Sequence, residues 1–163
     1  MAGYSILPDV GCASNDGVLF ISSVSMHCPG WVVLDVTPLW QASTQRGADL
    51  LIPGRPGMLP LPRRITSTEV SLRMIINGNY TAGGVYNYNA RLGLYNNIEY
   101  LNSAIVVPAP GGSLRNVTLY APGGGSSKTQ GAHVTGLEIG DQVGAFCKAV
   151  LTLVFPEGNL SGF

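Results

Sequence analysis

The chain has 163 residues and a mass of 17.1 kDa, which is the size of one domain with a single core. Nine basic and nine acidic side chains cancel, so net charge attracts the chain neither to nucleic acid nor to an anionic membrane. Charged residues make up only 11% of the sequence and hydrophobic residues 45%, but no apolar run approaches the roughly 20 residues that cross a bilayer. We therefore expect no membrane anchor. A weakly charged, apolar surface associates unless neighbouring subunits cover it, so we expect this chain to be a subunit of an assembly.

The cysteines and the first residues indicate where the chain is made. Cys12, Cys28 and Cys147 have neither the even number of a disulfide framework nor the spacing of a zinc site. Residues 1–5 lack the basic and apolar regions that begin a secretory signal. We therefore expect synthesis in a reducing compartment.

Short apolar runs separated by glycine and proline predict a mainly β fold. Residues 17–24 and 31–37 are rich in β-branched and aromatic side chains and are parted by a Pro-Gly breaker, which predicts a hairpin of two strands. Residues 69–76 alternate apolar and polar side chains and predict the clearest strand, followed by an Asn-Gly turn.

Residues 46–64 read RGADLLIPGRPGMLPLPRR. Four prolines exclude a helix or a central strand here, which predicts a long, stiff loop. Loops of this length without secondary structure are uncommon in compact domains and most often contact a partner.

Basic residues gather in and around this loop. The formal charge is −3 over residues 1–45, +4 over residues 46–91 and −1 over the remainder. Seven of the nine cations are arginine, whose planar fork suits carboxylates at interfaces. We expect this basic band to meet the acidic N-terminal third of a neighbouring copy; an exposed charged loop is the alternative, and nucleic-acid binding is disfavoured because aromatic residues are not interleaved. The predicted subunit-contact residues are Arg46, Asp49, Arg55, Arg63 and Arg64.

Residues 90–105 carry the one helical pattern, an apolar stripe of Leu94, Ile98, Leu101 and Ile105 that predicts packing against a sheet. Tyr95 and Tyr100 belong to the same segment, and we expect them to cover the sheet.

The C-terminal third predicts strands at residues 113–120, 133–139 and 142–155, with a flexible connection over residues 122–127. The last two strands are expected to form a hairpin that turns at Gly140-Asp141. Together, the elements predict a single domain over residues 1–163, a two-layer β-sandwich or open barrel with one flanking helix.

The sequence offers no catalytic, cofactor-binding or metal-binding residue. His27 and His133 have no metal spacing, and the HExxH, GxSxG and P-loop motifs are absent. Neighbours on a strand point to opposite faces, so His27 and Cys28 do not predict a dyad. The run GGGSSK at residues 123–128 resembles a phosphate loop, but no helical pattern follows it.

Five of the seven tyrosines fall between residues 80 and 100. Tyr80, Tyr86 and Tyr88 belong to a predicted loop, where they suit contact with a protein partner or stacking against a sugar. A carbohydrate-binding recognition module is therefore one alternative function. A hydrolase of the cell envelope is a weaker one, and it would depend on His133.

One combination of motifs is distinctive: WVVLDVTPLWQAS at residues 31–43, RGADLLIPGRPG at 46–57, PRR at 62–64, MIINGNYTAGG at 74–84 and GLYNNIEYLNSAIV at 93–106. This combination resembles minor tail proteins of long-tailed (siphovirus-type) phages that infect actinobacteria, in particular those similar to the N-terminal domain of distal tail proteins. The likeness spans residues 31–155.

The resemblance implies a structural virion protein without catalysis, made in the cytoplasm of a bacterial host. Its fold would be a β-sandwich with one helix. It would assemble with itself and with other tail proteins, as a ring or as an accessory subunit at the tail tip. Distal tail proteins often carry a second, receptor-facing domain for which this length leaves no room, so hub, cap, collar and fibre-attachment roles all stay open. Tail-tube and tail-terminator subunits, of comparable size and related fold, are alternatives.

Overall fold

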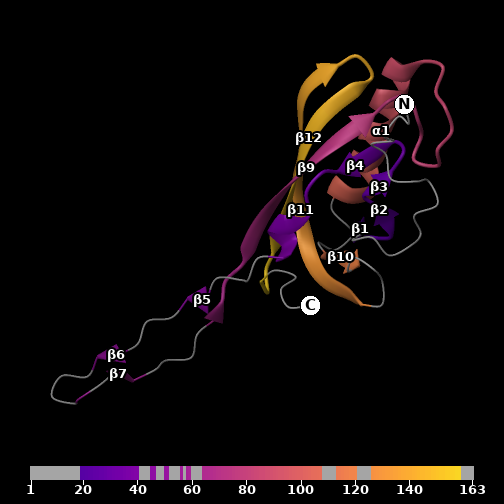
Figure 1. Ribbon diagram of the computed structural model, residues 1–163. Coiled ribbons are helices and arrows are strands. Elements are labelled where there is room, and N and C mark those ends of the chain that lie inside the picture. The colour runs from indigo at the N-terminus through magenta and orange to yellow at the C-terminus, as the bar shows by residue number, and fades with distance from the viewer. Residues whose placement is uncertain are drawn as a thin grey trace, which may run out of the picture.

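The computed structural model describes residues 19–40, 45–46, 50–51, 56, 58–59, 64–107, 113–120 and 126–158. Eight strands form one sheet in the order β2-β1-β10-β11-β12-β9-β4-β3, and every pair is antiparallel (Figure 1). The strands are β1 (Leu19–Ile21), β2 (Val24–Ser25), β3 (His27–Cys28), β4 (Trp31–Val33), β9 (Thr68–Asn77), β10 (Arg115–Tyr120), β11 (Ser127–Val143) and β12 (Phe146–Phe155). The expected mainly β fold is confirmed.

The two edge strands of the sheet, β2 and β3, are consecutive in the chain, so the sheet has to curl to bring its two edges together. Met26 lies between them, donates its backbone N–H to the Leu19 carbonyl at 2.8 Å and accepts from the Val33 N–H at 3.0 Å. The 17-residue β11 pairs first with β10 and then with β12, so it belongs to both halves of the sheet. The architecture is a single open, curled sheet, closer to the open barrel than to two separately bonded layers.

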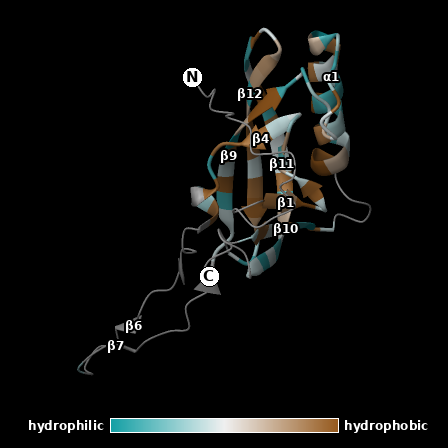
Figure 2. Cartoon of the chain, turned by 45° about the vertical axis from the view of Figure 1, so that its right-hand side comes forward, coloured by the Kyte–Doolittle hydropathy of each residue, from teal (hydrophilic) through white to brown (hydrophobic). Residues whose placement is uncertain are grey.

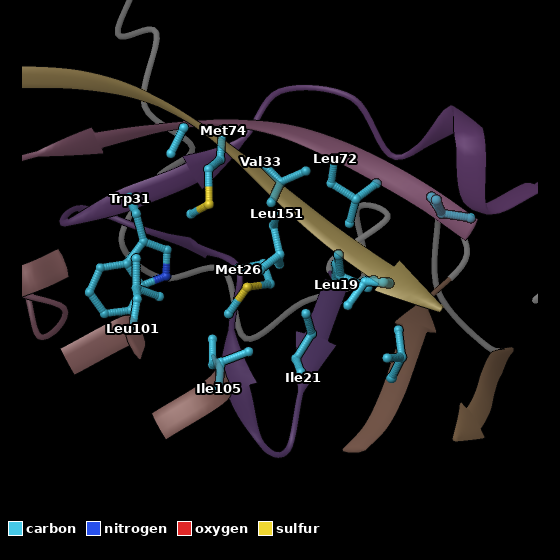
Figure 3. Packing of buried hydrophobic residues seen from close by; sticks show 14 of the residues in the cluster. Leu19, Ile21, Met26, Trp31, Val33, Leu72, Met74, Leu101, Ile105 and Leu151 are labelled. Carbon is cyan, nitrogen blue, oxygen red and sulfur yellow. The ribbon is translucent and has the colours of Figure 1, made fainter. Parts of the chain in front are cut away.

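The core fills the inner side of this sheet. Along β9, Val70, Leu72, Met74 and Ile76 are buried while the residues between them face outward. Figure 2 shows the alternation as bands of hydrophobic and hydrophilic colour along β9. Figure 3 shows Leu151 of β12 and Met26, which lies between β2 and β3, pointing into the same space as Leu101 and Ile105 of the helical segment. Each such side chain contributes roughly 1.5–3 kcal/mol through removal from water.

Helix α1 (Ala90–Leu101) continues into a π-helical turn, η2 (Asn102–Val106). The Asn89 side chain accepts from the Leu92 N–H at 3.2 Å and so caps an N-terminal amide that has no partner within the helix. Leu94, Leu101 and Ile105 are buried and Ile98 is partly buried against the core. The expected helix and its apolar stripe are confirmed.

The segment between β4 and β9 carries two short antiparallel pairs, where the sequence predicted a loop without secondary structure. After the 3-10 helix η1 (Thr37–Trp40), β5 (Gln45–Arg46) pairs with β8 (Arg64–Ile65), and β6 (Leu50–Leu51) pairs with β7 (Met58–Leu59). We call these four strands the arm; Figure 1 shows them leading away from the sheet. None of the four prolines is one of the paired residues, so the prolines do not remove any N–H group that the short strand pairs need.

The predicted hairpin of residues 17–24 with 31–37 is wrong. β1 pairs with β10, and β4 pairs with β9. The connection between the two runs forms β2 and β3, which extend the two opposite edges of the sheet.

The hairpin of β11 and β12 is confirmed, but its turn is not at the predicted place. The chain turns at Gly144-Ala145, where Gly144 has a φ of +61° that favours glycine. Gly140-Asp141 lies inside β11 at an irregularity of the register between Ile139 and Gln142. β11 also begins at Ser127, earlier than predicted, so a strand follows the glycine-rich run. Within the described ranges, no helix is long and apolar enough to span a bilayer.

Candidate functional site

Two of the predicted contact residues, Arg46 and Arg64, hold opposite positions in the register of the β5–β8 pair at the base of the arm. Their contact role stays a prediction. Asp49, Arg55 and Arg63 lie outside the described residues, so their contact role stays a prediction.

The three loop tyrosines gather on the surface, as the sequence suggested. Tyr80 and Tyr86 form an isolated β-bridge, and their ring centroids are 5.6 Å apart at an interplanar angle of 75°. Tyr86 and Tyr88 are 5.7 Å apart at 90°. Tyr86 is 54% exposed and Tyr88 99% exposed, so the cluster presents aromatic area to solvent.

The two helical tyrosines differ from each other. Tyr95 is 63% exposed and does not cover the sheet, which corrects the expectation for this residue. It follows the buried Leu94 and is turned about 100° around the helix from it. Tyr100 does cover the core at one point, where its ring stacks on buried Trp31 with centroids 5.6 Å apart and an angle of 24°.

Two buried asparagines, neither of them predicted from the sequence, hold the tyrosine loop to the sheet. The Asn97 side chain is 5% exposed and donates to the backbone carbonyls of Asn77 and Tyr80, each at 2.8 Å. The Asn77 side chain donates to the Pro29 carbonyl at 3.3 Å and accepts from the Asn79 N–H at 3.0 Å. These bonds tie helix α1 and the loop to the end of β9, and they satisfy carbonyls that water does not reach.

Two glycines allow the helix to touch the end of β9. A Cβ on Gly78 would lie 2.0 Å from the Ala90 carbonyl oxygen, and a Cβ on Gly93 would lie 2.1 Å from the Gly78 carbonyl oxygen. Both distances are far below a van der Waals contact, and both obstacles are backbone. The close approach therefore requires glycine at both positions.

Exposed apolar side chains gather at this end of the molecule. The Gly78 N–H donates to the Ala145 carbonyl at 2.8 Å, which joins the β11–β12 turn to the tyrosine loop. Val143 is 73% exposed and Phe146 about half exposed beside that turn, at the same end as the start of α1 (Figures 1 and 2). We call this surface the aromatic end; it comprises the partly buried Tyr80 and the exposed side chains of Val85, Tyr86, Tyr88, Leu92, Val143 and Phe146. A concentration of exposed apolar side chains marks an interaction surface.

Burial shifts the pKa values of both His27 and Cys28. Burial lowers the pKa of His27, opposed by a hydrogen bond with the Val33 backbone, and burial raises the pKa of Cys28. Both shifts favour the neutral forms, whereas a reactive cysteine needs a stabilised thiolate. Across the part of the chain that the structure describes, no three His, Cys, Asp or Glu side chains gather where they could hold a metal ion.

His27 is expected to make the fold sensitive to acid. Its Nδ1 is buried without a hydrogen-bond partner, and its pKa is lowered in the folded state. The unfolded chain therefore binds a proton first, so folding stability falls as pH drops below about 6.5 towards the lowered folded pKa. Thermal unfolding between about pH 8 and pH 5 should show the wild type losing more stability than His27→Gln. Parallel curves for the two proteins would contradict this role.

The sequence matches no family model and no curated protein. The fold is similar to a solved structure, the Dit protein (gp 19.1) of phage SPP1, described as a paradigm of the hub adsorption apparatus in phages that infect Gram-positive bacteria. The TM-score is 0.53 at 14% identity, over 85% of this chain and 49% of that protein, so the chain spans about half the length of SPP1 Dit. The chain thus shares its fold with a phage hub protein.

Proposed function

We propose that the chain is a structural subunit of a phage tail that sits at the tail tip and acts by binding neighbouring subunits, without catalysing a reaction. The observation that carries this proposal is the likeness of fold to SPP1 Dit over 85% of the chain. The low charge of the sequence and the aromatic end support it independently, because both suit a protein whose surface is covered by neighbours.

The arm and the aromatic end are placed for a head-to-tail contact between copies. β9 leads from the arm to the turn at Gly78 and has ten residues, about 30 Å of extended chain. The two surfaces therefore lie at opposite ends of the sheet (Figure 1). A contact between unlike surfaces of identical subunits repeats around a ring when the rotation closes. In the proposal, the basic band of one copy meets the acidic N-terminal third of the next copy, and the contact residues of the band are Arg46, Asp49, Arg55, Arg63 and Arg64.

The tyrosine cluster serves protein contact in this proposal, and stacking against a host cell-surface glycan is the less favoured alternative. The rings of Tyr80, Tyr86 and Tyr88 stand at 75° and 90° to their neighbours, which gives this surface an irregular aromatic shape. Irregular aromatic relief of this kind suits the pockets of a protein surface. Tail-tube and tail-terminator positions remain alternatives for the same kind of subunit.

Charge reversal in the basic band tests the proposal. We expect Arg55→Glu and Arg63→Glu to reduce incorporation into phage particles at least tenfold, because losing one partner of a buried charge pair costs about 2–5 kcal/mol. Arg73→Glu is the matched control: it makes the same charge change at an exposed position of β9, away from the arm. Circular dichroism and thermal unfolding check that all three variants fold. Normal incorporation of both arm variants would contradict the proposed contact.

A further inference from the structure

The outer face of β1, β10 and β11 carries a pocket of about 310 Å³ that neither the arm nor the aromatic end uses. Its aromatic wall consists of Phe20 and Tyr120, whose ring centroids are 5.6 Å apart at an angle of 74°. Leu19, Ile21 and Leu119 point into the core, so the side chains between them face outward. The two aromatic side chains are therefore available to a ligand on the outer face.

The rest of the lining is polar and uncharged. Thr118 and Thr129 lie opposite each other in the β10–β11 pair, and their hydroxyl oxygens are 2.8 Å apart. Asn116 adds an amide two residues along β10. Among the described residues that line the pocket, none carries a charge. Hydroxyls and an amide can each donate and accept hydrogen bonds, which fits a ligand that does both.

The turn between β1 and β2 supplies two more hydroxyls at a cost in stability. Ser22 and Ser23 have φ values of 49° and 70°, in the left-handed region, and the Ser22 N–H donates to the Asn116 carbonyl at 2.8 Å. A hairpin turn with two positive φ values strongly prefers asparagine and glycine. Strained residues of this kind cluster at binding sites, where the surrounding structure holds them in place.

We infer that this pocket binds a neutral saccharide. Sugars place C–H groups against aromatic rings and pair their hydroxyls with side chains that donate and accept, and both features meet in this pocket. The volume lies at the lower end of the range for ligand sites, enough for one or two sugar rings. An uncharged lining offers nothing to neutralise a phosphate or a uronate and no carboxylate for a metal ion. The site is separate from the proposed assembly contacts, and the inference does not depend on them.

Amide chemical shifts of the labelled chain test this inference. The probes are D-glucose, D-galactose, L-rhamnose and N-acetyl-D-glucosamine, with D-glucuronic acid as the anionic control. We expect at least one neutral sugar to cause saturable shifts at Ser22, Ser23 and Thr118, and the uronic acid to bind more weakly. Phe20→Ala should weaken binding at least tenfold because it removes half of the aromatic wall.

Ser23→Gly separates loss of binding from loss of folding. Glycine relieves the left-handed strain and removes one hydroxyl, so this variant should melt at a higher temperature and bind sugar more weakly. Tyr88→Ala is the matched control for loss of an aromatic ring outside the pocket and should leave binding unchanged. The inference is overturned if no neutral sugar causes saturable shifts, or if binding survives both Phe20→Ala and Ser23→Gly. Loss of binding on Tyr88→Ala would likewise overturn it and place the sugar on the tyrosine cluster.

Discussion

Replacing Gly78 by alanine is expected to separate helix α1 from the sheet. The new methyl group would lie 2.0 Å from the Ala90 carbonyl oxygen, 2.6 Å from the Leu94 nitrogen and 2.8 Å from the Leu94 Cβ. The first two atoms are helix backbone, which no change of rotamer can move. We expect a loss of about 3 kcal/mol or more in the free energy of unfolding, the upper range for overpacking a core. Urea unfolding followed by circular dichroism measures it.

Gly136→Ala is the matched control for this substitution. A Cβ at Gly136 in β11 would meet no atom within 4 Å. We expect a change within about 0.5 kcal/mol, as for most surface substitutions. Equal losses in the two variants would show that the close approach at Gly78 is not what requires glycine.

Asn97→Ala is expected to cost about 2–4 kcal/mol, because it removes the side-chain donor from the buried carbonyl of Asn77 and from the partly buried carbonyl of Tyr80. The same substitution should loosen the tyrosine loop, since Asn97 is what bonds Tyr80 to the helix. Chemical denaturation gives the loss of stability. Amide hydrogen exchange over residues 79–89 reports the loosening directly.

The neighbouring Asn96 provides the control. It lies on the same helix, is exposed, and is the same residue type. Asn96→Ala should leave stability unchanged or raise it slightly, because alanine is the better helix former. If the two asparagine variants unfolded alike, burial of the Asn97 amide would not be what matters.

The elements that the sequence predicted well are those fixed by local pattern. Alternation over residues 69–76 marks a strand with one buried face, and it was observed over Thr68–Asn77. The spacing of Leu94, Leu101 and Ile105 marks one buried side of a helix. In both cases the spacing of the apolar side chains indicates which face of the element is buried, and this spacing is contained within one segment of the sequence.

The pairing of strands could not be predicted from local patterns in the same way. β1 pairs with β10, so Leu19 lies opposite Leu119, a hundred residues along the chain. The apolar pattern of β1 fits any neighbour that shares its inner face, and only the packing of the whole sheet selects one. The predicted position of the β11–β12 turn was wrong for a related reason. Gly140-Asp141 is a good turn sequence, but it lies at an irregularity within β11, and the strand continues to Val143.

The candidate sites were partly visible in the sequence. Three tyrosines close together in a loop indicated a surface cluster, and the structure brings them together. Asn97 carried a weaker signal: it is a polar residue three positions after Leu94, on the buried side of the helix, where it needs partners. The saccharide pocket carried none, because its residues come from β1, β10, β11 and the turn at Ser22-Ser23, which only the fold unites.

We propose that this chain is a structural part of a phage tail. Mass spectrometry of purified, intact particles, from a phage whose genome carries this sequence, tests the proposal most directly. We expect the chain in several copies per particle, and we expect it to stay with isolated tails when heads are removed. Particles that are complete and infectious but contain none of this chain would contradict the claim.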